Sequence, residues 1–114
     1  MDINKNENNL KLISLIVSHN PPITFNKLIT QLLLISEEII IIDSSTIEIY
    51  NDILKYLKNE RIVLIHEKKH YGLGNALNLG IDKANQFSYD FLLIMEDDSF
   101  FRGKIVSVIL YVLL

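Results

Sequence analysis

The chain has 114 residues, of which 49% are hydrophobic, and its formal net charge at pH 7 is −3. A chain of this length can bury one hydrophobic core, so we predict a single domain. The negative charge, with Lys68 and Lys69 as the one adjacent pair of lysines, argues against a nucleic-acid-binding surface, and the absence of cysteine excludes disulfides and thiolate metal sites.

The first half of the chain alternates apolar runs with helical patterns. Residues 1–10 are polar, so we predict a flexible lead-in that lacks the apolar core of a secretory signal. The apolar, β-branched run at 12–17 predicts a strand that ends before two consecutive prolines. Apolar residues at helical spacing then predict a helix over 24–35, and strand and helix follow again at 39–42 and 47–58.

The second half continues this alternation. We predict a third strand over 61–66, followed by a glycine turn and by the most regular amphipathic helix of the chain, over 73–84. A fourth strand covers 89–95. Strands that alternate with helices are typical of an α/β fold with a parallel sheet and right-handed crossovers, here over residues 11–99.

The last part of the chain, residues 100–114, is predicted to be an apolar tail. Residues 105–114 have a helical apolar face, which predicts a helix. Their ten residues are about half the length that a membrane-spanning helix needs. Because the opposite side of this helix is also apolar, we expect it to associate with a partner subunit or a membrane surface.

Three consecutive acids follow the fourth strand directly. In an extended segment residues two apart point the same way, so Glu96 and Asp98 can bind one cation while Asp97 points elsewhere. Divalent cations held by one or two carboxylates and completed by substrate phosphates are usually Mg²⁺ or Mn²⁺. The alternative interpretation is a solvated acidic turn that ends the strand.

Polar residues also follow the other three predicted strands. The four polar segments are 18–20, 43–45, 67–70 and 96–99. A parallel sheet brings the carboxyl ends of its strands to one edge, and ligands bind outside those ends, so we predict a ligand site there. At this edge Asp43 can accept hydrogen bonds from a ribose or a base. Alternatively, Asp43 or Ser44 can cap the helix that follows.

Several other kinds of site do not fit the sequence. The turn at Gly72 and Gly74 has Leu77 where a dinucleotide-binding fingerprint needs its third glycine, although a phosphate can still approach this helix start. The phosphate-binding P-loop pattern and the nucleophile elbow of serine hydrolases are absent. The histidines at 19, 66 and 70 are too far apart in the sequence to form a metal site by themselves.

Four segments, taken together, resemble successive motifs of the family 2 glycosyltransferases, in particular of the rhamnosyltransferase-like branch. They are LISLIVSHNPP, IIIIDSS, HYGLGNALNLGI and FLLIMEDDS. The resemblance covers residues 11–99 and implies the Rossmann-like, nucleotide-sugar-binding half of the A-type glycosyltransferase fold, truncated after the fourth strand. The implied reaction moves a sugar from a nucleoside diphosphate to an acceptor hydroxyl with inversion.

The resemblance also implies which residues bind the nucleotide. Ser18 and His19 fall where the first loop of the family meets the nucleotide. Asp43 falls where an acid contacts the base or the ribose. Asn75 lies where many members have a lysine or arginine near the diphosphate, so this chain supplies no positive charge at that position.

The acids after the fourth strand match the D-x-D motif of the family. Glu96 and Asp98 fall on its two acids, which implies that they bind Mg²⁺ or Mn²⁺, and Asp97 between them is assigned to the nucleotide. A divalent cation would neutralise the negative charge that develops on the leaving diphosphate. Glu96 replaces the usual aspartate and is longer by one methylene.

We therefore expect a donor-binding glycosyltransferase fragment. In the family the acceptor site and the general base follow the D-x-D motif, so in a chain that ends at Leu114 we expect the catalytic base to be missing and the fragment to be inactive alone. The resemblance implies synthesis of surface polysaccharide in the cytoplasm, at the inner face of a bacterial membrane. The alternatives are a non-catalytic nucleotide-binding or regulatory α/β module completed by a partner, and a receiver-like signalling domain.

Overall fold

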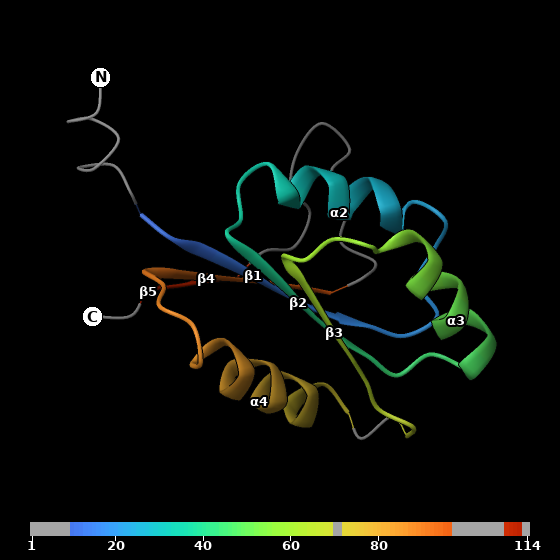
Figure 1. Ribbon diagram of the computed structural model, residues 1–114. Helices are drawn as coiled ribbons and strands as arrows, with labels where there is room; N and C mark the ends of the chain where they lie inside the picture. Colours follow the sequence, from blue (N-terminus) through green and yellow to red (C-terminus); the bar gives the residue numbers. More distant parts are fainter. Residues whose placement is uncertain (1–9, 70–71, 97–108, 113–114) are drawn as a thin grey trace.

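The computed structural model describes residues 10–69, 72–96 and 109–112 (Figure 1). In this part of the chain, five strands form one sheet in the order β3-β2-β1-β4-β5, and three helices pack against it. The strands are β1 (Leu12–Ser18), β2 (Glu38–Asp43), β3 (Ile62–His66), β4 (Phe91–Glu96) and β5 (Ile109–Val112). The helices are α2 (Phe25–Leu33), α3 (Ile47–Tyr56) and α4 (Leu73–Ala84).

The first four strands run parallel, which confirms the predicted α/β fold. β1 lies between β2 and β4, and β2 also pairs with β3. The chain therefore moves outward from β1 to β3 and then returns through α4 to the other side of β1. Such a reversal of strand order is the position where open α/β sheets bind their ligands.

The helices cover both faces of the sheet: α2 and α3 lie on one face, and α4 lies on the other (Figure 1). Successive residues of a strand point to opposite faces, so Ile39 and Ile41 of β2 contact the α2 and α3 layer, whereas Ile40 and Ile42 contact the α4 layer. Both sets are buried, which explains why β2 is an unbroken apolar run.

The prediction of a helical tail is wrong for Ile109–Val112. These residues form β5, which pairs antiparallel with β4 and extends the sheet by one strand beyond the four predicted. Isoleucine, valine and tyrosine favour strands, and the pairing occupies backbone groups on a side of β4 that would otherwise form an open sheet edge. The rest of residues 100–114 lies outside the described residues, as do most of the lead-in residues 1–10.

In residues 10–69, 72–96 and 109–112 no helix is long and apolar enough to cross a membrane.

Candidate functional site

The loops after β1 and β2 meet at the carboxyl edge of the sheet. Ser18 and Asp43 are neighbours in the β1–β2 register, and Asp43 and His66 are neighbours in the β2–β3 register. Their side chains belong to the face that α2 and α3 cover, because they continue the alternation of Ile16, Ile41 and Leu64. We call Ser18, Asn20, Asp43, Ser45 and His66, which are linked by the contacts described below, the Asp43 cluster.

Asp43 is the centre of this cluster. Its side chain is fully buried, with 0% of the residue exposed. Oδ1 accepts hydrogen bonds from Ser18 Oγ at 2.7 Å and from Ser45 Oγ at 2.6 Å, and Oδ2 accepts one from the Ser45 backbone N–H at 3.1 Å. A buried carboxylate is stable only with such partners, and hydrogen bonds to a charged group are among the stronger ones in proteins.

The alternative prediction that Asp43 caps the next helix is wrong. Helix α3 begins at Ile47, and its N-cap residue, Thr46, makes no side-chain cap hydrogen bond. The Asp43 carboxylate binds the amide of Ser45, which precedes this cap. Asp43 therefore joins two loops rather than starting a helix.

Asn20 makes the sharp turn after β1. It has a φ of 47°, in the left-handed region that most L-amino acids avoid at a cost of about 1–2 kcal/mol and that asparagine tolerates better. Its backbone N–H donates to Ser45 Oγ at 2.7 Å, and its Oδ1 accepts from the Thr46 N–H at 3.1 Å. Hydrogen bonds to the β2–α3 loop thus hold the turn in place.

Two histidines lie beside this cluster. The exposed His19 places Nδ1 at 2.9 Å from the carbonyl oxygen of Ser44 and at 3.1 Å from its hydroxyl. A carbonyl oxygen only accepts hydrogen bonds, so Nδ1 carries the hydrogen. His66 donates in the same way from Nε2 to the Ser45 carbonyl oxygen at 2.9 Å, and the same nitrogen lies 3.9 Å from Asp43 Oδ2.

Tyr50 and His66 form a contact that we did not predict from the sequence. The Tyr50 ring stacks on the His66 imidazole with 4.0 Å between ring centroids and 23° between their planes. Tyr50 falls on the apolar face of the predicted second helix, so its spacing indicates packing and nothing more specific. The one sequence feature that could have indicated this contact is a tyrosine on the helix that follows Asp43 at the end of a strand.

The acidic segment begins beside this cluster. Glu96 ends β4, and its backbone is the register neighbour of Val17, one residue before Ser18. The carboxyl ends of β1, β2 and β4 therefore meet, as the sequence predicts. Asp97 and Asp98 lie outside the described residues, and among those that are described no group of three or more histidine or acidic side chains is placed to hold a metal ion.

Asn75 lies at the same edge of the sheet but on its other face. It is exposed in the first turn of α4, which follows Gly72 with a φ of 97°. Glycine is the residue best suited to this backbone conformation. Ser18, His19 and Asp43 are thus brought together, whereas Asn75 approaches the edge from the side of α4.

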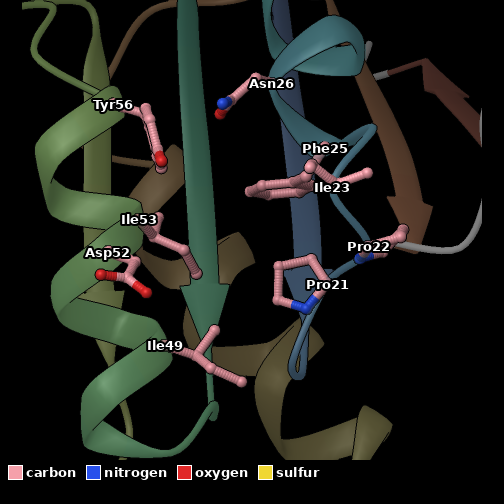
Figure 2. A pocket seen from close by; sticks show the side chains of 9 residues that line it. All are labelled: Pro21, Pro22, Ile23, Phe25, Asn26, Ile49, Asp52, Ile53 and Tyr56. Atoms are coloured by element: carbon pink, nitrogen blue, oxygen red, sulfur yellow. The ribbon is translucent and has the colours of Figure 1, made fainter.

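A hollow of about 470 Å³ lies between α2 and α3 (Figure 2). Its walls are mainly apolar, and none of the predicted site residues lines it. The lining residues are Pro21, Pro22, Ile23, Phe25, Asn26, Ile49, Asp52, Ile53 and Tyr56. One of the lining residues is acidic: Asp52 is exposed, and its Oδ1 lies 3.8 Å from Lys55 Nζ.

Comparison with known proteins identifies the family. The model of glycosyl transferase family 2 matches residues 15–110, a range that includes most of β1 and extends into β5. No curated protein matches the sequence significantly. Because the family match covers most of the chain, this protein belongs to glycosyl transferase family 2.

Proposed function

We propose that this family 2 domain binds the nucleoside diphosphate of a sugar donor at the carboxyl edge of its sheet. The observation that carries the proposal is the meeting of the loops after β1 and β2, where Ser18 and Asp43 share a hydrogen bond of 2.7 Å. The backbone of Glu96 lies next to this contact, at the reversal of strand order. Family membership makes a nucleotide sugar the expected substrate.

The exposed and buried residues of this site have different proposed roles. His19 is exposed, so its imidazole is available to face a nucleotide. Asp43 is fully buried and both of its carboxylate oxygens already accept hydrogen bonds. Because Asp43 is fully buried, a direct contact with the base or ribose requires its side chain to become accessible. An indirect role, in which Asp43 holds Ser18 and Ser45 in place, requires no rearrangement.

We also propose that Glu96 and Asp98 hold Mg²⁺ or Mn²⁺, with Asp97 facing the nucleotide. Two carboxylates with alternate positions suit a hard divalent cation that keeps open positions for phosphate oxygens. When bound, such a cation would neutralise the charge on the leaving diphosphate. The β1–β4 register supports this assignment, because it brings the start of the acidic segment beside Ser18.

The resemblance of the sequence motifs supports two narrower proposals. The first is that the donor and acceptor are those of the rhamnosyltransferase-like branch, which acts in polysaccharide synthesis. The second is a cytoplasmic location at the inner face of the membrane. Cell fractionation with an antibody against the chain tests the location, and recovery of the chain outside the cytoplasm would contradict it.

Isothermal titration calorimetry tests donor binding. The full chain is titrated with uridine, guanosine and thymidine diphosphates, each with Mn²⁺ and each with EDTA. We expect Mn²⁺-dependent binding of at least one of them, weakened at least tenfold by Asp98→Ala, because this change removes a carboxylate ligand of the cation. Asp82→Ala changes an exposed acid on α4 and serves as the matched control, with less than a twofold effect expected.

Two results would contradict this proposal. Wild-type protein that takes up none of the three nucleotides in the presence of Mn²⁺ has no donor site. Equal affinity with Mn²⁺ and with EDTA, or equal weakening by Asp98→Ala and Asp82→Ala, would remove the proposed metal site while leaving the nucleotide site in place.

A further inference from the structure

The loop that carries His19 is fixed on both sides of this residue. On one side Ser18 donates its hydroxyl hydrogen to Asp43 Oδ1. On the other side the backbone N–H of Asn20 donates to Ser45 Oγ. The first bond ends on Asp43, the last residue of β2, and the second ends on Ser45 in the loop between β2 and α3. The position of His19 at the sheet edge therefore depends on a segment that lies 25 residues further along the chain.

Ser45 is the link between the buried charge and the left-handed turn. Its hydroxyl has a single hydrogen, which it donates to Asp43 Oδ1 at 2.6 Å, so toward Asn20 it is an acceptor at 2.7 Å. The residue is only 4% exposed, and water therefore competes little for these bonds. The negative carboxylate polarises the hydroxyl and strengthens its acceptor oxygen, as expected in a chain of hydrogen bonds.

Asn20 needs this support because of its backbone conformation. Among the described residues other than glycine, it is the one with a positive φ. Without the bond that its N–H donates to Ser45 Oγ, Asn20 would keep the bond to the β2–α3 loop that its Oδ1 accepts from the exposed Thr46 N–H. The buried bond is therefore the more important one for the turn.

We propose that Ser45 is a positioning residue of the nucleotide site. It does not contact the sugar nucleotide itself. Its hydroxyl links the Asp43 carboxylate to the Asn20 amide and so holds the loop in the conformation that exposes His19 at the sheet edge. This inference rests on the proposed function, because it assumes that a nucleotide binds next to His19.

Ser45→Ala and Ser14→Ala form a matched pair for its test. Ser14 is also on the α2 and α3 face and is also buried, with its Oγ at 2.7 Å from Ser36 Oγ, but it lies in the middle of β1. Each variant loses one buried hydroxyl, which makes two hydrogen bonds at Ser45 and one at Ser14. Their thermal unfolding is compared first, so that a loss of stability is separated from a loss of binding.

Amide hydrogen exchange, measured by NMR without ligand, reports the turn. In Ser45→Ala we expect the Asn20 amide to exchange at least tenfold faster, since its acceptor is gone, and in Ser14→Ala we expect no change at Asn20. Titration with the three nucleoside diphosphates and Mn²⁺ then reports the site. We expect at least tenfold weaker binding by Ser45→Ala and less than a twofold change for Ser14→Ala.

Asn20→Ala and Asn20→Gly provide a second, independent comparison. Both variants lose the bond between Oδ1 and Thr46 and keep the backbone bond to Ser45. Alanine disfavours the positive φ and glycine accepts it. We expect the alanine variant to bind the nucleotide at least threefold more weakly than the glycine variant.

The outcomes separate this inference from the proposed function. A wild-type chain that binds no nucleoside diphosphate overturns both. A wild-type chain that binds, with unchanged affinity in Ser45→Ala despite faster exchange at Asn20, overturns the positioning role alone. Unchanged exchange at Asn20 in Ser45→Ala overturns the positioning role as well, because Ser45 would then not hold the turn. Equal loss of affinity in Ser45→Ala and Ser14→Ala also overturns it, because the loss would then reflect general stability.

Discussion

The two faces of the central sheet are built from different residues. On the α4 face, small residues bring the helix close to the sheet: Ala76, Gly80 and Ala84 are all buried. On the α2 and α3 face, large side chains such as Phe25 and Leu28 fill the layer. The Asp43 cluster lies on the α2 and α3 face, at the carboxyl ends of the strands. This face therefore combines apolar packing with buried polar groups.

This difference separates two kinds of effect that a substitution can have. The described core of the α4 face is apolar, so changes there should alter the free energy of unfolding and leave ligand binding intact. The α2 and α3 face carries Ser18, Asp43 and His66 at its end, so changes there should alter both quantities. Substitutions on each face test whether stability and ligand binding are affected separately in this way.

The largest effect is expected for Asp43→Ala. This change leaves the hydroxyls of Ser18 and Ser45 and the Ser45 amide without their buried acceptor. Unsatisfied buried donors cost about 1–3 kcal/mol each, partly offset here because a buried charge is also removed, so we expect a loss of about 3 kcal/mol. Urea unfolding gives the stability, and nucleotide titration of the folded variant should show loss of binding.

A stable Asp43→Ala variant with wild-type nucleotide affinity would contradict this difference between the two faces. It would show that the buried carboxylate neither holds the two loops nor affects the site. Loss of stability with unchanged affinity would confine Asp43 to a structural role.

A smaller effect is expected for Gly80→Ala on the opposite face. A methyl group at Gly80 would overlap the side chain of Leu15 on β1, so α4 or Leu15 must move. Overpacking of this kind costs about 1–3 kcal/mol, and we expect about 2 kcal/mol in urea unfolding with nucleotide affinity within twofold of wild type.

Gly74→Ala is the matched control for Gly80→Ala. Gly74 lies on the same helix, and a methyl group there meets open space. Alanine favours a helix over glycine by up to about 1 kcal/mol, so this variant should be as stable as wild type or more stable. Equal destabilisation by both changes would show that Gly80 is not a point of close packing.

The fold could be predicted from the sequence because most elements have an unambiguous pattern. The run at 39–42 is too short for a helix and apolar throughout, and the stripe from Leu73 to Ala84 has a clear helical period. Residues 109–112 have no such pattern. A short run of isoleucine, leucine, tyrosine and valine fits a strand or a helix, and pairing with β4, which is a tertiary contact, decides between them.

For the candidate site, the sequence predicts which residues lie near one another but not the hydrogen bonds between them. Parallel strands bring Ser18 and Asp43 to one edge, so their proximity follows from the topology. The bonds from Ser45 to Asp43 and Asn20 depend on the exact register and on backbone dihedrals, which no spacing pattern encodes. The roles of Asp97 and Asp98 stay predictions.

We propose that the nucleotide binds at the carboxyl edge of the sheet and not in the hollow between α2 and α3. Two-dimensional ¹⁵N NMR of the labelled full chain, titrated with the three nucleoside diphosphates and Mg²⁺, tests it most directly. We expect saturable chemical-shift changes of the amides of His19, Asn20 and Ser45, with the amides of Asn26 and Tyr56 in the hollow unchanged. Shifts confined to Asn26, Tyr56 and their neighbours, or no shifts at all, would contradict it.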